Sequence, residues 1–145
     1  MRLERILFLA VLGGCASQPV PQAAKPQLSF EQVTEAVKPF IAQARATYPD
    51  AKRRFLAGLP QGQAFFVSVP LRDAGGRVEQ AYVAVQTYQG HTILGRIASP
   101  LERVHGFVVG DPYQGSESGV MDWVIIHPDG SEEGKFIGRF LEHRL

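Results

Sequence analysis

The sequence contains little cysteine and almost no excess of charge of either sign. A single cysteine among 145 residues excludes an intramolecular disulfide bond and a cysteine-based zinc site. The 15 Lys and Arg against 14 Asp and Glu argue against a dedicated nucleic-acid-binding protein, because such proteins usually carry a basic surplus. Hydrophobic residues at 45% and charged residues at 20% are typical of a folded chain, and the length suits one domain.

The start of the chain follows the pattern of a bacterial lipoprotein signal. Two arginines precede the apolar residues 6–12. A helix over these residues would be about 10 Å long, which is too short to span the ~30 Å hydrocarbon core of a membrane. This stretch therefore predicts a secretory signal rather than a membrane span. Residues 12–15, which read LGGC, resemble the lipobox of bacterial lipoproteins. The resemblance implies a signal peptide over residues 1–14 and acyl chains on Cys15; the alternative is an ordinary signal peptide that contains a cysteine.

Lipidation at Cys15 would attach the chain to a membrane through acyl chains alone. Removing residues 1–14 takes away two arginines and one glutamate, which leaves 13 basic and 13 acidic side chains and little attraction to anionic lipid. Ala16 follows the cysteine in place of Asp, and by resemblance to enterobacterial sorting this suggests the outer membrane, facing the periplasm. Residues 15–28 contain three prolines and no aromatic residue, and we expect them to form an extended tether.

Helical signals begin at Ser29. Ser29 and Gln32 match a capping box, and apolar residues then recur at helical spacing. Pro39 is expected to kink or divide this helix, and Pro49 to end its second piece and begin a third. From residue 63 the apolar period changes to two, which predicts strands.

The strand pattern predicts a sheet that follows the helices. Strands are expected at residues 65–71, 78–88, 92–97, 107–109, 120–126 and 135–141, with a polar, flexible loop at 111–119 and a tight turn at 127–130. The first three strands would form an antiparallel meander. We therefore expect a single α+β domain over residues 29–145, with N-terminal helices packed on a strongly bent antiparallel sheet of five or six strands.

Four short segments together resemble a known family. In chain order they read GRIASP, MDWV, PDGSEEG and GRFL, beginning at residues 95, 121, 128 and 138. Their order and spacing resemble the YegJ-like domain of unknown function, number 2314 in the DUF series, over about residues 44–141. One departure is Ala81, where the family pattern has an aromatic residue. The family has no established activity, so the resemblance implies no catalytic residue.

Asp122 and Trp123 are the candidate binding residues. Asp122 falls on the same alternate set as Val120, Val124 and Ile126, which is the face that a core would occupy. A carboxylate there is either hydrogen-bonded to backbone, most simply in the loop 111–119, or held in a cleft for function. Trp123 is the only tryptophan and either stacks on a ligand or packs as a cover for the helices.

Other polar clusters have simpler explanations than chemistry. His127, Asp129, Glu132 and Glu133 could form a metal site, but their spacing matches no ligand pattern. Residues 128–130, which read PDG, are explained by the preference of these residues for a tight turn. We therefore expect no metal and no cofactor. The basic run of Lys52, Arg53 and Arg54 either meets lipid headgroups or peptidoglycan carboxylates or is simply solvated. The remaining histidines, in turn or terminal contexts, are His91, His105 and His143.

These observations favour a non-catalytic, lipid-anchored module of the cell envelope that binds an envelope protein or a cell-wall component. No convergent acid–base set, metal pattern or phosphate loop is seen, and catalytic residues remain unassigned. One alternative is a small envelope hydrolase that uses Asp122 with a nearby Glu or His. Another is an immunity or inhibitor protein that forms a tight complex with its partner.

Overall fold

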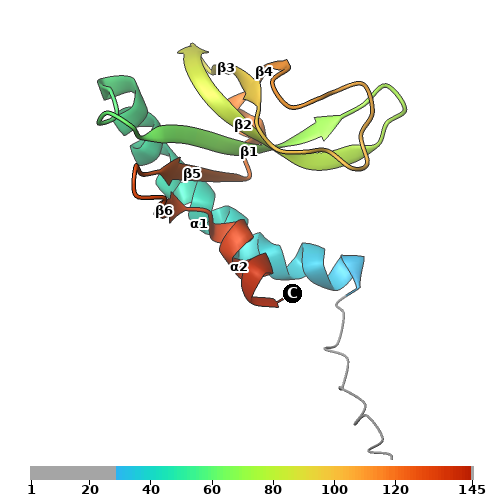
Figure 1. The fold of residues 1–145 in the computed structure, drawn as a ribbon. Coiled ribbons are helices and arrows are strands. Elements are labelled where there is room, and N and C mark those ends of the chain that lie inside the picture. The colour runs from blue at the N-terminus through green and yellow to red at the C-terminus, as the bar shows by residue number, and fades with distance from the viewer. Residues whose placement is uncertain (1–28, 145) are drawn as a thin grey trace, which may run out of the picture.

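The computed structural model describes residues 29–144, which form two helices and a six-stranded antiparallel sheet that is not closed (Figure 1). This confirms the expected α+β class. The predicted signal peptide, Cys15 and the predicted tether lie outside the described residues. The elements are α1 (Phe30–Ala57), β1 (Ala64–Arg72), β2 (Val78–Gln89), β3 (Thr92–Ile97), β4 (Pro112–Ser116), the 3₁₀ turn η1 (Glu117–Gly119), β5 (Asp122–Ile126), β6 (Glu132–Gly134) and α2 (Phe136–Arg144).

Helix α1 begins with the expected capping box. The Gln32 N–H donates to Ser29 Oγ at 3.3 Å, and the Ser29 N–H donates to Gln32 Oε1 at 2.8 Å. These bonds satisfy two backbone donors that the first turn of a helix cannot pair internally. The capping box therefore fixes the start of α1 at the position that the sequence predicts.

The predicted division of this helix into separate pieces is wrong. α1 runs without interruption for 28 residues and contains both Pro39 and Pro49. A proline inside a helix removes one hydrogen bond and costs about 3 kcal/mol. Three side chains of α1, Ala44, Tyr48 and Ala51, are buried against the sheet on either side of Pro49. Burial along this face offsets the local cost of the prolines, so one continuous helix forms.

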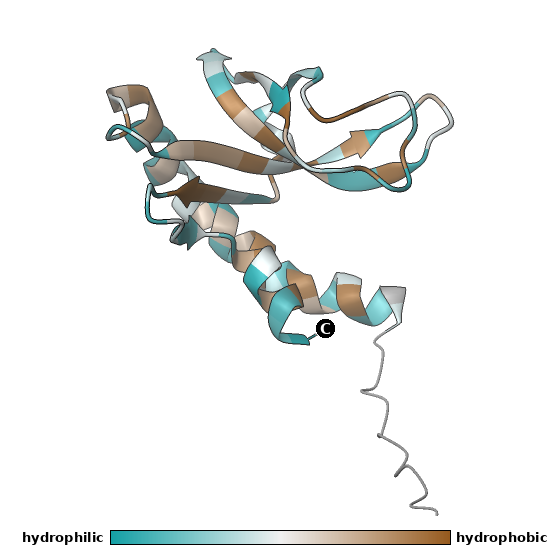
Figure 2. Cartoon of the chain, viewed as in Figure 1, coloured by the Kyte–Doolittle hydropathy of each residue, from teal (hydrophilic) through white to brown (hydrophobic). Residues whose placement is uncertain are grey.

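The strand order of the sheet is β4-β3-β2-β1-β5-β6. β1, β2 and β3 form the expected meander, and β5 pairs antiparallel with the free side of β1. α1 packs on one face of this sheet, and Figure 2 shows the apolar residues that run along β1 and β5. The main core comprises Ala44, Tyr48, Ala51, Phe65, Val67, Val69, Val83, Val85, Ile93, Val120, Trp123 and Ile125.

The connection between β3 and β4 differs from the prediction. Residues 107–109 form no strand, and the expected polar loop at 111–119 contains β4 and η1 instead. Glu79 accepts the backbone N–H groups of Glu102, Arg103 and Val104 at 2.7 to 3.1 Å. These bonds fix the connection so that the following residues lie beside β3 and pair with it. No local sequence pattern encodes contacts of this separation.

A second carboxylate, Asp73, holds the same connection. It accepts the N–H of His105 at 3.0 Å and the guanidinium Nε–H of Arg77 at 2.8 Å. The His105 hydrogen bond, together with bonds from Arg77, lowers the pKa of Asp73 to about 2 against the opposing effect of burial. Asp73 therefore stays ionised and bonded at neutral pH, which keeps the loop in place.

The predicted strand at 135–141 is also wrong. Residues 132–134 form the short strand β6, and α2 follows at once. Gly134 has φ 84° and Lys135 has φ 56°, so the chain turns sharply out of the sheet. α2 then packs along α1, where the Phe40 and Phe140 rings stack with centroids 4.7 Å apart. The apolar pattern that predicts a strand at 135–141 therefore belongs to α2, whose Phe140 packs against Phe40 of α1.

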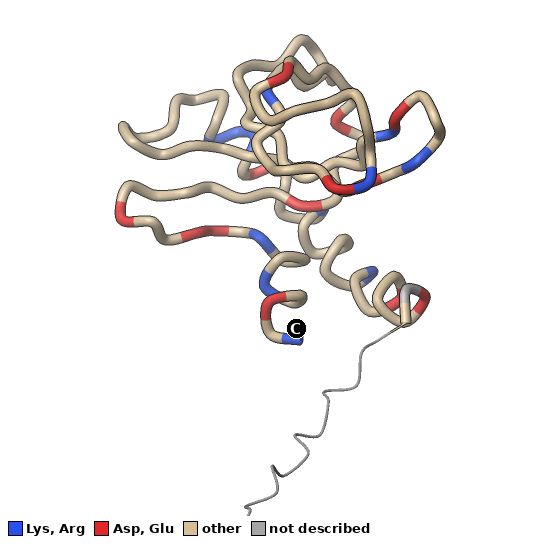
Figure 3. Tube along the Cα trace, turned by 45° about the vertical axis from the view of Figure 1, so that its right-hand side comes forward, with Lys and Arg blue, Asp and Glu red and all other residues tan. Residues whose placement is uncertain are grey.

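Charges of both signs are interspersed over the described surface (Figure 3). Between residues 29 and 144, neither helix is long and apolar enough to cross a bilayer.

Candidate functional site

Asp122 is fully buried and binds backbone. Its Oδ1 accepts the N–H groups of Trp123 at 2.9 Å and Phe136 at 3.1 Å, and its Oδ2 accepts that of Ile137 at 2.8 Å. The expectation that loop 111–119 supplies these donors is wrong, because the start of α2 lies there instead. Burial raises the pKa of Asp122, and the N–H bonds oppose that effect only in part. The carboxylate caps α2 and faces no cleft.

Trp123 is buried between the two helices and β5. Its indole Nε1–H donates to Thr47 Oγ1 of α1 at 3.0 Å, and its ring meets Phe136 of α2 edge-on at 5.9 Å. Only 4% of the residue is exposed. The structure therefore places this tryptophan as the cover for the helices. Trp123 also lines a surface hollow beside Thr47 and Glu133, whereas Asp122 is fully buried.

The polar residues around the 127–130 turn are held by ion pairs and turn hydrogen bonds, and Glu133 contacts both Arg54 and His127. Arg54 binds Glu133 with both guanidinium nitrogens, at 2.5 and 2.9 Å, and Lys135 binds Glu132 at 2.7 Å. Asp129 accepts the N–H of Ser131 at 2.9 Å inside the turn. Within residues 29–144, no three His, Asp or Glu side chains converge on a position that could hold a metal ion.

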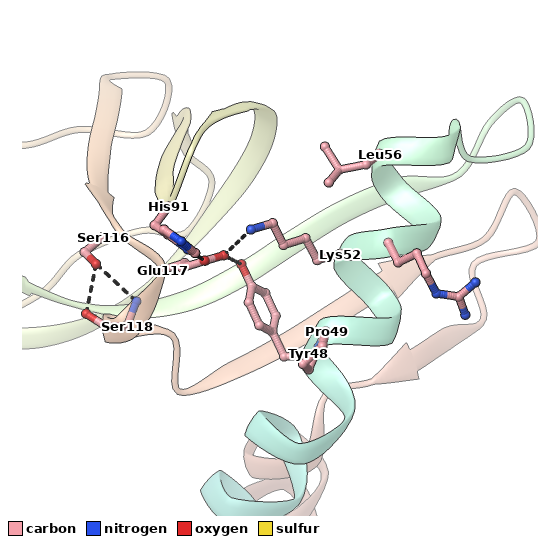
Figure 4. Close-up of a pocket in the computed structure, with 9 residues that line it drawn as sticks. Tyr48, Pro49, Lys52, Leu56, His91, Ser116, Glu117 and Ser118 are labelled. Carbon is pink, nitrogen blue, oxygen red and sulfur yellow. Dashed lines mark hydrogen bonds and ion pairs between the residues drawn. The ribbon is translucent and has the colours of Figure 1, made fainter.

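A concave surface lies between α1 and the end of the β3–β4 pair. This groove has a volume of about 780 Å³. Figure 4 shows Tyr48, Lys52 and His91 pointing toward Glu117 from segments far apart in the sequence. The lining residues are Tyr48, Pro49, Lys52, Arg53 and Leu56 from α1, His91 from the β2–β3 turn, and Ser116, Glu117 and Ser118 from the end of β4 and η1.

Glu117 joins the two sides of the groove. Its Oε2 lies 2.5 Å from Lys52 Nζ and accepts a weaker bond from the Tyr48 hydroxyl at 3.4 Å, while its Oε1 contacts His91 Nδ1. Burial disfavours the ionised form of Glu117, but the hydrogen bonds and charges of Lys52 and His91 outweigh it and lower its pKa. At neutral pH the groove is therefore closed at its base by an ionic link between α1 and η1.

Two tyrosines support this link from below. The hydroxyl groups of Tyr48 and Tyr88 lie 2.7 Å apart, and Lys52 Nζ lies 4.6 Å from the centre of the Tyr88 ring. Burial raises the pKa of Tyr88 to about 12, and burial together with the Tyr88 hydrogen bond raises that of Tyr48. Both hydroxyl groups therefore remain neutral, and the cation over the ring adds to the attraction that holds Lys52.

The rim of the groove is open to solvent. Leu56 is 60% exposed, and the side chain of His91 is 88% exposed. Arg53 is also exposed and is paired only with the exposed Asp50 of the same helix. The groove thus offers an apolar contact, an exposed guanidinium and an imidazole beside serine hydroxyls, which suits binding of a polar ligand with an apolar part.

The sequence draws attention to the basic run of residues 52–54 but indicates neither the groove nor its carboxylate. The three residues of this run have different surroundings. Lys52 and Arg53 line the groove, whereas Arg54 binds Glu133 of β6. Glu117 lies 65 residues from Lys52 in a segment that the sequence assigns to a loop. No local spacing links these positions, and only the packing of α1 on the sheet brings them together.

We predict a measurable coupling energy between Lys52 and Glu117. In a double-mutant cycle with Lys52→Met and Glu117→Gln, urea unfolding should give about 1 kcal/mol, since both side chains are largely buried. The matched control is the exposed pair Glu35 and Lys38 on the same helix, for which we expect below about 0.5 kcal/mol. Equal coupling energies in the two cycles would show that the Lys52–Glu117 pair stabilises the fold no more than an exposed ion pair does.

Comparison of this chain with protein-family models, with curated proteins and with solved structures gives no match. The resemblance to the YegJ-like domain therefore stays a prediction from the four short segments.

Proposed function

We propose that this chain is a lipid-anchored protein of the bacterial cell envelope, held in the outer membrane through acyl chains on Cys15, that binds a partner without catalysing a reaction. The partner is an envelope protein or a cell-wall component. The observation that carries the proposal is the groove between α1 and η1, an open concave site whose base is fixed by buried ionic and hydrogen-bonded contacts.

The arrangement of the groove favours binding over catalysis. Glu117 is engaged by Lys52 and His91 and has a lowered pKa, so it is a poor proton donor at neutral pH. The tyrosine hydroxyls beneath it hold their protons. The alternative of a hydrolase built on Asp122 has no support from the geometry, because that carboxylate is buried and accepts three backbone N–H groups.

The rim indicates what the ligand carries. Arg53 offers guanidinium donors for a carboxylate, and Leu56 offers an apolar contact beside it. Peptide side chains of an envelope protein and the carboxylates of a peptidoglycan stem peptide share this chemistry. The predicted tether before Ser29 would let the groove reach such partners from the membrane surface.

In-cell photo-crosslinking tests this proposal. A photoreactive amino acid replaces Leu56 in the groove, and the matched control replaces Val78, the exposed apolar residue of β2 that lies outside the groove and is 41% exposed. We expect one dominant adduct from the Leu56 position, identified by mass spectrometry, and only background from the Val78 position. The adduct should weaken when Cys15→Ser removes the anchor.

Two results would contradict the proposal. The same adducts from both positions would show that the groove has no partner of its own. An unchanged membrane-bound mature protein after Cys15→Ser would show that the anchor is not at this residue, whatever the groove binds.

A further inference from the structure

The two edges of the sheet differ in how they are protected. At the β6 edge, the backbone C=O of Glu132 accepts a guanidinium N–H of Arg139 from α2, and the chain leaves the sheet directly after Gly134. At the β4 edge, no other strand between residues 29 and 144 pairs with the outer side. Natural proteins usually cover or charge an open strand edge, because its free backbone groups invite another strand to pair.

The ladder between β3 and β4 shows which backbone groups point outward. The Ile97 N–H donates to the Asp111 C=O and the Glu117 N–H donates to the His91 C=O, each at 2.9 Å. In an antiparallel ladder such bonds recur at every second residue, so Tyr113 and Gly115 also bond inward to β3. The backbone groups of the three residues between these positions therefore face the open edge; they are Pro112, Gln114 and Ser116.

Apolar side chains flank both ends of this edge. Val108 and Val109, which are 65% and 56% exposed, lie in the turn just before β4. Leu56, 60% exposed, lines the groove that contains Ser116 at the other end of the strand. Among the described residues only four large hydrophobic side chains are exposed, and three of them are at these two ends. Exposed apolar groups that cluster around an open edge indicate a contact surface.

We propose that a second copy of this chain pairs through β4, antiparallel, about a two-fold axis at Gln114. In this register the Gln114 N–H and C=O of each copy bond to those of the partner's Gln114. The Ser116 N–H donates to the C=O of the partner's Pro112, which needs no N–H of its own for that bond. The open edge is thus self-complementary, and pairing extends one sheet across the two copies.

The two-fold axis also brings the apolar ends together. Because this register sets Pro112 of the partner opposite Ser116, the partner's Val108–Val109 turn comes to the end of β4 that borders the groove. A second copy is favoured over an unrelated peptide strand because it presents the same open edge together with the apolar side chains that flank both of its ends. The partner's turn then forms an additional wall of each groove without filling its base, where Lys52 and Glu117 are bonded.

A disulfide test addresses this register directly. The purified full chain carries Cys15→Ser, so that Gln114→Cys introduces the only thiol. Residues that face each other in such a pair lie about 5.5 Å apart at Cα, within the range that a disulfide spans. Under mild oxidation we expect at least about fivefold more covalent dimer than from the control Gln86→Cys, an equally exposed position of β2. A mixture of Pro112→Cys and Ser116→Cys should also crosslink to each other.

A charge exchange provides a second, independent measurement. Gln114→Lys alone and Gln114→Glu alone place like charges across the axis, and mixing the two variants should give a pair bound about tenfold more tightly than either like-charged pair, as measured by analytical ultracentrifugation. Equal disulfide yield from positions 114 and 86, or no preference for the mixed pair, would overturn the proposal. Neither of these outcomes depends on what the groove binds.

Discussion

Replacing Asp122 with asparagine is expected to lower the free energy of unfolding by about 2–3 kcal/mol, which corresponds to a fall in Tm of about 10 °C. The carboxylate accepts three backbone N–H groups, two of them from the first turn of α2, and it is fully buried. An asparagine amide presents one oxygen and one NH₂ group to these donors. At least one buried N–H group is then left without an acceptor, and the charge that caps the helix is lost.

Asp129→Asn is the matched control for this experiment. Asp129 is also an aspartate that accepts a backbone N–H, that of Ser131, but it lies in an exposed turn. We expect a loss below about 1 kcal/mol there, because water replaces the missing interaction. Chemical unfolding of the purified full chain measures both variants. If Asp122→Asn were no less stable than Asp129→Asn, the capping role of Asp122 would be refuted.

Replacing Gly134 with alanine is expected to destabilise the protein by about 3 kcal/mol or more. Gly134 ends β6 with φ 84°, a conformation that costs an L-residue about 1–2 kcal/mol by itself. A Cβ at this position would also lie 2.3 Å from the backbone oxygen of Trp123, and backbone cannot move aside as a flexible side chain can. The turn from β6 into α2 would have to shift, and Asp122 would lose its position beside the α2 N-terminus.

Gly130→Ala separates the cost of the positive φ from the cost of the steric clash at Gly134. Gly130 has φ 82°, almost the same as Gly134, but a Cβ there would meet nothing within 4 Å. We expect this variant to lose only the conformational cost of about 1–2 kcal/mol. Urea unfolding curves of both variants provide the comparison. Similar losses at the two glycines would mean that backbone conformation alone accounts for the requirement at Gly134.

The parts of the fold that follow local rules could be predicted from the sequence. The Ser29–Gln32 capping box marks the true start of α1, and the period-two pattern locates β1, β2 and β3. These signals are local because each depends on residues a few positions apart. The predicted breaks at Pro39 and Pro49 fail for the opposite reason, since the helix is held by burial of its inner face against a sheet formed later in the chain.

The C-terminal error has a comparable physical origin. Residues 135–141 carry apolar side chains that fit a short strand as well as a short helix, and periodicity alone does not separate the two. The helix is selected by Asp122, which lies 14 residues before Phe136 and supplies the cap that the first turn needs. The sequence pattern marks Asp122 as an unusual carboxylate but contains no local signal for the position of its donors.

The candidate site shows the same division. The sequence alone determines that the chain has one cysteine next to a lipobox-like segment, near-zero net charge, and a helical region followed by antiparallel strands. These properties are set by composition and by neighbours along the chain. Only the tertiary structure decided that Asp122 and Trp123 are buried, that Lys52 meets Glu117 across the groove, and that β4 is an open edge. Each of these depends on contacts between residues far apart in sequence, and their free energy exists only once α1 has packed on the sheet.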